Sequence, residues 1–129
     1  MEFPEELFYT QDHEWLRKVK DHAFVGITDF AQKELGDIVY VEIETLGRKL
    51  KRHEIFGTVE AVKTVSDLYL PVSGIIVDIN SAISSHPQLV NEDPYGKGWL
   101  IIVKMEDINE SLELMNASKY KELIGLPAS

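Results

Sequence analysis

Lys63 is the residue of this chain whose type and surroundings best suit it for covalent chemistry, because it stands between two runs of alternating residues. The first run predicts a strand over 55–61, with Ile55, Gly57, Val59 and Ala61 on one face. The second predicts a strand over 65–70, so the two would form a β-hairpin with Lys63 at its tip. A primary amine held outward on a stiff hairpin can be reached by an enzyme and can carry an attached group. Most exposed turn lysines, by contrast, only solvate a loop.

Four further side chains are candidates for a site around this lysine. Glu60 and Asp67 flank it on the two arms of the hairpin, where they could have a role beside the lysine or simply end the strands in solvent. His13 and Glu14 lie in a polar segment near the N-terminus, where they could stabilise a loop. No paired ligand spacing links the remaining histidines, so no metal site is expected at His22, His53 and His86.

Composition narrows the classes of function. The 129 residues, 44% of them hydrophobic, suffice for one domain over 1–129 with an apolar core. The chain has no cysteine, which excludes disulfides, thiol catalysis and cysteine-ligated metal. The net charge of −9 disfavours nucleic-acid binding and suits a soluble carrier. No run reaches the length of a membrane span, and the acidic start resembles no signal or transit peptide, so we expect a cytoplasmic protein without a membrane role.

The elements that must position the lysine are mostly strands. Thr28 is a suitable N-cap for a short helix over 29–35, and Gly36 is placed to end that helix in a left-handed conformation. Trp15 and Leu16 are expected to enter the core from one of two short strands within 8–19. The other predicted strands cover 23–27, 37–43, 74–79 (as the return strand of the lysine hairpin), 89–90 and 99–105.

The C-terminal part changes to a helical pattern. Ile108, Leu112 and Met115 would share one face of a helix, and a second helix over 118–124 would pack Tyr120 and Leu123. Short strands at regular spacing with turns between them predict a mainly β fold, a flattened barrel or sandwich of antiparallel sheets. The expected architecture is therefore this sandwich, a short helix near 29–35 and C-terminal helices.

The hairpin and its surroundings resemble the H protein of the glycine cleavage system, a family of lipoyl carriers. Val62-Lys63-Thr64 lacks the methionines typical of biotinyl carriers. The family has a tip lysine followed by similar residues, and the resemblance extends over about residues 9 to 105 in the family's order. The matching segments are VEAVK at 59–63, SDLY at 66–69, PVSG at 71–74, HEW at 13–15, VGITDFAQ at 25–32, LGDIVYVE at 35–42, LVN at 89–91, DPYG at 93–96 and GWL at 98–100.

The resemblance implies a function. Lipoate would be attached to Lys63 by a lipoate ligase or lipoyl transferase, and the protein, itself no enzyme, would carry the aminomethyl group of glycine. Its partners would be a pyridoxal-phosphate glycine decarboxylase, a tetrahydrofolate-dependent aminomethyltransferase and dihydrolipoyl dehydrogenase. Glu60 and Asp67 would be recognised during lipoate attachment. The resemblance also places the bend at 12–14 near the hairpin, so that Glu14, beside His13, would form an exposed ion pair with the amine of the loaded arm.

Two other interpretations remain open at this stage. An H-like protein can also carry sulfur intermediates or relay lipoate to other proteins, and an unmodified β-sandwich adaptor would carry nothing. In each case the chain is expected to be monomeric.

Overall fold

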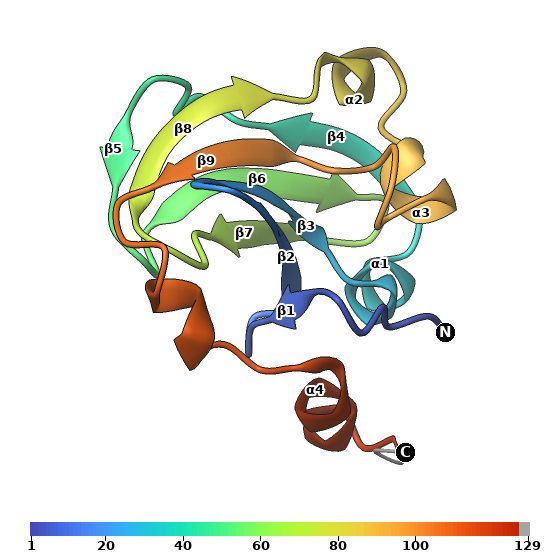
Figure 1. Cartoon of the computed structure of the whole chain (residues 1–129). Coiled ribbons are helices and arrows are strands. Elements are labelled where there is room, and N and C mark those ends of the chain that lie inside the picture. The colour runs from blue at the N-terminus through green and yellow to red at the C-terminus, as the bar shows by residue number, and fades with distance from the viewer. Residues whose placement is uncertain (127–129) are drawn as a thin grey trace.

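A computed structural model describes residues 1–126, which form two antiparallel sheets around a common core (Figure 1). The six-stranded sheet has the order β1 (Phe8–Tyr9), β2 (Glu14–Val19), β3 (His22–Ile27), β9 (Ile101–Met105), β8 (Gly74–Ile79) and β5 (Lys49–Leu50). The three-stranded sheet has the order β4 (Ile38–Glu42), β6 (Ile55–Ala61) and β7 (Val65–Tyr69). This arrangement confirms the predicted flattened sandwich of mainly antiparallel strands.

The predicted lysine hairpin is confirmed, with one change in which residues face the core. β6 and β7 pair antiparallel from Ile55 opposite Tyr69 to Glu60 opposite Val65. A bulge shifts the register between Ile55 and Gly57, so Phe56 is buried and Ile55 is exposed, contrary to the predicted face. The prediction that 74–79 is the return strand of this hairpin was also wrong, because β8 lies in the other sheet between β9 and β5.

Among residues 1–126, five short helical segments connect the strands or follow the last of them (Figure 1). They are α1 (Asp29–Leu35), α2 (Ser81–Ser85), α3 (Leu89–Glu92), the 3-10 turn η1 (Glu110–Glu113) and α4 (Ala117–Leu123). The strand predicted at 89–90 was wrong, since these residues begin α3, which is a single turn and too short to show helical periodicity in the sequence. Within residues 1–126, no helix combines the length and the hydrophobicity that crossing a membrane would require.

The helix expected over 29–35 is confirmed as α1. The Thr28 side chain accepts a hydrogen bond from Ala31 N, which satisfies one free amide of the first turn. Gly36 has the expected positive φ of 81°, but its ψ of −156° lies outside the left-handed helical region. Glycine is still favoured there, because residues with a Cβ rarely adopt this conformation.

The C-terminal segment departs from its predicted stripe. Residues 110–113 form only the turn η1, and Leu112 is 68% exposed. Met115 instead exchanges two backbone hydrogen bonds with Tyr9, of 2.8 and 2.9 Å, which requires an extended chain rather than a helix. The second predicted helix is confirmed as α4, with Tyr120 buried but Leu123 exposed.

Both faces of β2 are buried, which explains why consecutive residues enter the interior. Leu16 belongs to the main core between the two sheets, whereas Trp15 packs in a second cluster. That second cluster joins the two ends of the chain through Phe3, Leu7, Tyr9, Tyr95, Ala117 and Tyr120. The N-terminal bend is therefore held between two apolar clusters.

Gly74 begins β8 at a point where β9 passes very close. A Cβ on Gly74 would lie 2.2 Å from the carbonyl oxygen of Lys104 and 2.7 Å from Cγ1 of Val103. Gly74 does not have a positive φ. Among the described glycines, those that do are Gly36, Gly47 and Gly125. The expected reason for this glycine, a turn with positive φ, was therefore wrong, and the reason is space.

Replacing Gly74 with alanine should cost about 3 kcal/mol of unfolding free energy, the upper part of the range for overpacking, because the backbone of β9 cannot rotate away. Gly47→Ala is the matched control: φ is 84° there, and a Cβ would meet nothing within 4 Å. It should cost only the roughly 1–2 kcal/mol of a left-handed residue. Urea unfolding of both variants measures the difference, and a larger loss for Gly47→Ala would contradict the steric explanation.

Candidate functional site

The tip of the hairpin exposes Lys63 and fixes the backbone beneath it. Ala61 N donates to Thr64 O at 2.8 Å, which closes the turn. Val62 N donates to Asp37 O at 3.1 Å and so ties the tip to the loop between α1 and β4. The flanking Val62 is 71% exposed. The lysine amine is therefore presented on an ordered turn.

Asn91 of α3 holds the loop on which this tip rests. Its Nδ2 donates to Gln32 Oε1 and to Gly36 O, both at 2.9 Å, and its Oδ1 accepts from Ile38 N at 2.9 Å. The Lys63 side chain lies over this loop: its Cε is 3.4 Å from the position that a Cβ on Gly36 would take. The Lys63 side chain is therefore within van der Waals reach of the Gly36 position.

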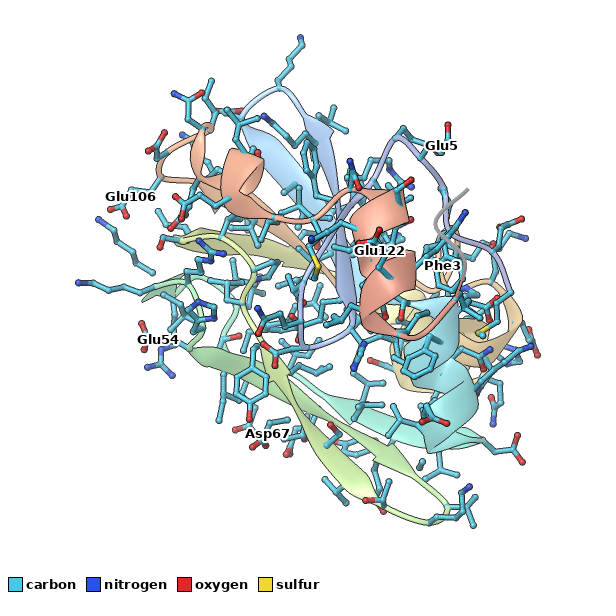
Figure 2. The ribbon with its side chains drawn as sticks, turned by 90° about the horizontal axis from the view of Figure 1, so that it is seen from below. Phe3, Glu5, Glu54, Asp67, Glu106 and Glu122 are labelled. Atoms are coloured by element: carbon cyan, nitrogen blue, oxygen red, sulfur yellow. The ribbon has the colours of Figure 1, made fainter. Side chains whose placement is uncertain are left out.

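A groove of about 210 Å³ lies beside the hairpin, between the N-terminal bend, α1 and β7. Its apolar wall consists of Ile27, Phe30, Ala31, Leu35, Val59 and Leu68. Its polar lining consists of Asp12, His13, Glu14, Glu34, Ser66 and Asp67. Figure 2 shows the Asp67 side chain on the hairpin, at the side of the molecule away from α4. Such a groove suits an aliphatic chain that ends in a cation.

Glu14 is the buried carboxyl group of the groove, with only 1% of its surface exposed. Its Oε2 accepts from the amide of Tyr69 on β7 at 2.7 Å, and its Oε1 accepts from Thr10 Oγ1 at 3.2 Å. Among residues 1–126, no cation forms a salt bridge with it. Burial raises the pKa of Glu14 to about 8, although the hydrogen bond from Tyr69 opposes that shift.

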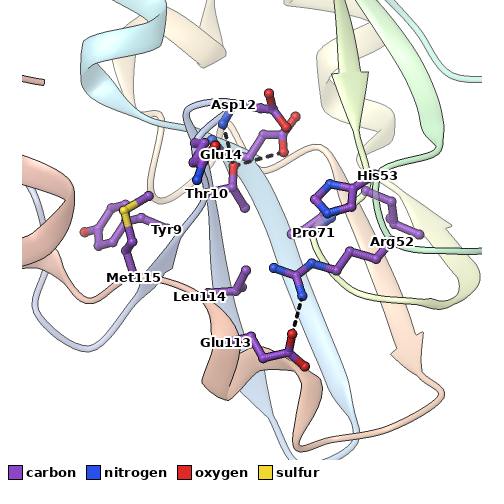
Figure 3. Close-up of a pocket in the computed structure, with 12 residues that line it drawn as sticks. Tyr9, Thr10, Asp12, Glu14, Arg52, His53, Pro71, Glu113, Leu114 and Met115 are labelled. Carbon is purple, nitrogen blue, oxygen red and sulfur yellow. Dashed lines mark hydrogen bonds and ion pairs between the residues drawn. The ribbon is translucent and has the colours of Figure 1, made fainter. Parts of the chain in front are cut away.

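The same carboxyl group borders a second pocket, of about 270 Å³, on the side of Arg52 and Pro71 (Figure 3). There the Arg52 guanidinium bonds Glu113 at 2.9 Å, away from Glu14. Glu14 therefore stands in the wall between two cavities.

His13 lines the groove from a strained backbone position, with a φ of 65°. Its Nδ1 is 2.8 Å from the hydroxyl of Tyr120, and its ring lies 5.0 Å from that of Phe30. Burial lowers the pKa of His13, while the nearby carboxylates of Asp12 and Glu34 act in the opposite direction.

The structure brings together three of the predicted site residues along one groove and separates a fourth from it. His13, Glu14 and Asp67 line the groove, which begins at Ser66, three residues after Lys63. Glu60 does not line it: the residue is exposed on the three-stranded sheet, paired with Tyr40 and Val65. The predicted exposure of Glu14 was wrong, because the fold buries this carboxyl group against β7, while its pairing with the amine of a loaded arm stays a prediction.

Sequence reasoning missed the walls of the groove and the support of His13. Phe30 and Leu35 could have been found, because they share the apolar face of a helix that the sequence predicts. Tyr120 could not, since it lies 107 positions from His13 and no local pattern connects the two. No group of three or more acidic or histidine side chains in residues 1–126 is arranged to hold a metal ion.

The buried Glu14 should make stability fall as pH rises. Its folded pKa of about 8 exceeds its ordinary value of 4.5, so the folded state binds the proton more tightly between these pH values. The stabilisation that this tighter proton binding gives the folded state is complete below the pKa of the unfolded state. It is lost as the pH rises through the pKa of the folded state. Wild type should therefore lose stability relative to Glu14→Gln, by at most about 1.4 kcal/mol per pH unit within this window.

Chemical denaturation of both proteins from pH 5 to pH 9 tests this expectation, since the window of about 4.5 to about 8 is set by Glu14. All other titrating groups are common to the two chains, so the difference isolates Glu14. A difference in unfolding free energy that does not change with pH would show that the carboxyl group is ionised throughout.

Comparisons with known proteins agree with this arrangement. The chain matches the glycine cleavage H-protein family over residues 7–125. It is 57% identical to the glycine cleavage system H protein of Salinibacter ruber, over 95% of this chain and 99% of the relative. It is 54% identical to that of Chlorobium limicola, over 97% of this chain and 99% of the relative. A crystal structure of a glycine cleavage system H protein from Mycobacterium marinum superposes with a TM-score of 0.88 at 40% identity, covering 96% of this chain and 100% of that chain. The chain belongs to the glycine cleavage H-protein family.

Proposed function

We propose that Lys63 carries lipoate in amide linkage and that the protein thereby transports the aminomethyl group of glycine within the glycine cleavage system. The observation that carries the proposal is the exposed Lys63 at an ordered hairpin tip, three residues from a groove with an apolar wall and acidic groups. As a member of this family, the chain is a carrier component of that system and not a catalyst.

The residues present fit the lipoyl group and its cargo. The apolar wall of the groove matches an aliphatic chain, and the carboxyl groups of Glu14 and Asp67 match a terminal amine. When bound, lipoate would supply a dithiolane whose S–S bond opens as one sulfur accepts the aminomethyl group, and the dithiol left after unloading would be reoxidised to the disulfide. The protein supplies an attachment point, a shielded groove and opposite charge.

Glu14 gives the groove a means to hold and release a cation. With a pKa of about 8, its carboxyl group keeps a proton at neutral pH while the groove contains no cation. An ammonium group entering the groove would favour the ionised carboxylate, so its uptake should be accompanied by release of that proton. Asp12 and Asp67 add negative charge at the exposed parts of the same groove.

Glu60 serves a different step in this proposal. It lies on the exposed face of β6, close to Lys63 but outside the groove, where a lipoate ligase or lipoyl transferase can contact it. Asp67, on the other arm, is accessible to that enzyme as well. The surface that selects the lysine for acylation and the groove that shelters the cargo therefore share Asp67 and little else.

The proposed partners follow from the cargo. A pyridoxal-phosphate glycine decarboxylase loads the carrier, a tetrahydrofolate-dependent aminomethyltransferase unloads it, and dihydrolipoyl dehydrogenase restores the disulfide. A monomer with its lipoyl group on the exposed Lys63 at the hairpin tip can visit each of these in turn.

Lys63 should be the only acylated lysine, because it alone occupies the hairpin tip. Peptide mapping of protein from cells that contain lipoate should find one lipoyl group on Lys63, and Lys63→Arg should carry none, since guanidinium is a poor nucleophile. Modification that persists in the arginine variant, or that maps to another lysine, would overturn the proposal.

Assay with the partner enzymes distinguishes this function from the two alternatives. Lipoylated protein should accept an aminomethyl group from the decarboxylase in the presence of glycine. A sulfur carrier or lipoate relay would be lipoylated without being loaded by that enzyme, and an adaptor would not be lipoylated at all.

Glu14→Gln should leave acylation of Lys63 intact and shorten the lifetime of the bound cargo. The amide keeps the shape of the side chain but cannot become an anion opposite the amine. The lifetime should fall roughly ten- to a hundredfold, because a hydrogen bond to a charged group contributes roughly 1.5–3 kcal/mol and every 1.4 kcal/mol is a factor of ten. Release of the one-carbon unit as formaldehyde in buffer measures the lifetime, with Glu113→Gln as a control outside the groove. Equal decay of wild type and Glu14→Gln would mean that Glu14 holds no cargo.

A further inference from the structure

We propose that Tyr120 of the C-terminal helix is a positioning residue for the groove: its hydroxyl fixes the His13 ring and keeps it uncharged where a cation is to bind. The inference rests on the proposed function of the groove. It extends that function to α4, a helix that contributes no residue to the groove lining.

A chain of hydrogen bonds connects α1 with the groove through Tyr120. The Tyr120 hydroxyl is 2.8 Å from Thr28 Oγ1 and 2.8 Å from His13 Nδ1. Tyr120 and Thr28 are completely buried. The Tyr120 ring is held by stacking on Tyr9, with centroids 4.9 Å apart and planes 12° apart. The hydroxyl thus has a fixed position between its two partners.

The direction of the protons along this chain follows from the donors available. Thr28 Oγ1 accepts a hydrogen bond from the Ala31 amide, and Tyr120 is the other partner of this hydroxyl among the described residues. The buried Thr28 proton therefore finds an acceptor only if Thr28 donates to Tyr120. Tyr120 then donates its proton to His13 Nδ1. His13 therefore carries its single proton on Nε2, which is the neutral form of imidazole.

Protonation of His13 would reverse this chain. A proton on Nδ1 would have to be donated to Tyr120, whose own proton would turn toward Thr28. The Thr28 hydroxyl would then be left without an acceptor in a buried position, which is unfavourable. Burial itself lowers the pKa of His13, and burial raises that of Tyr120 to about 12, so the phenol keeps its proton.

An uncharged His13 matters because of what else faces the groove. The ionisable groups around the ring come from the bend, β2, α1, β7 and α4, and are Asp12, Glu14, Glu34, Asp67 and Tyr120. A histidine cation would pair with these carboxylates and repel an incoming ammonium group. The neutral ring leaves the negative charge of the groove to the cargo.

Histidine titration by NMR on the unacylated protein tests the first part. Tyr120→Phe frees the ring to turn toward Asp12 and Glu34, so the midpoint of His13 should rise by about half to one pH unit, the size of one neutral hydrogen bond. The matched control is Tyr9→Phe, which also removes a buried hydroxyl, one that bonds Pro4 O at 2.6 Å and not His13. The His13 midpoint of this control should equal that of wild type.

The lifetime of the cargo on the lipoylated protein tests the second part. Tyr120→Phe should lose cargo faster than wild type between the two midpoints, where only the variant has a charged His13, and at the same rate above its raised midpoint. An unchanged midpoint, or a loss that is equal at all pH values, would make Tyr120 a purely structural residue and overturn the inference. The titration needs no lipoate, so a failure of acylation at Lys63 would overturn the proposed function without deciding the His13 result.

Discussion

The hydrogen bond from the Tyr69 amide to the Glu14 carboxyl group is the interaction on which the groove depends. β7 is an edge strand, and its outer amides have no neighbouring strand to bond. Glu14 supplies an acceptor for one of them and so attaches the N-terminal bend to the base of the lysine hairpin. The space left between this bond, α1 and the hairpin tip is the groove. Using a carboxyl group as this acceptor costs folding free energy, because burial disfavours its charged form.

Two apolar clusters keep this bond in place. The bend is anchored on one side by Leu16 in the main core and on the other by Trp15 in the terminal cluster. The terminal cluster brings Phe3 and Tyr120 from opposite ends of the chain into edge-to-face contact, with ring centroids 5.7 Å apart. Segments that do not line the groove therefore define the position of those that do.

The parts of this structure that could be predicted from sequence are those with local causes. The hairpin follows from alternation around Lys63, and α1 follows from a capping threonine, an apolar face and a glycine at its end. The stripe of Ile108, Leu112 and Met115 suggested a helix, but pairing of Met115 with Tyr9 outweighed a weak local preference.

The parts that could not be predicted depend on distant contacts. The burial of Glu14 requires β7, 55 positions away, and the need for Gly74 arises from the approach of β9 rather than from its own turn. Family resemblance located the lysine and its neighbours and included Asn91 in a matching segment, but it did not show what Asn91 or Tyr120 contacts. These residues act through loops and rings whose positions only the folded chain determines.

The contacts around the hairpin tip also bear on its use as a separate module. Its orientation depends on the bond from Val62 N to Asp37 O, and the loop that contains Asp37 depends in turn on Asn91 of α3. A graft of residues 55–69 onto another scaffold would transfer the sequence that surrounds the lysine but neither of these supports. The lysine hairpin is contiguous in sequence, yet the unit that directs its side chain is assembled from three separate segments.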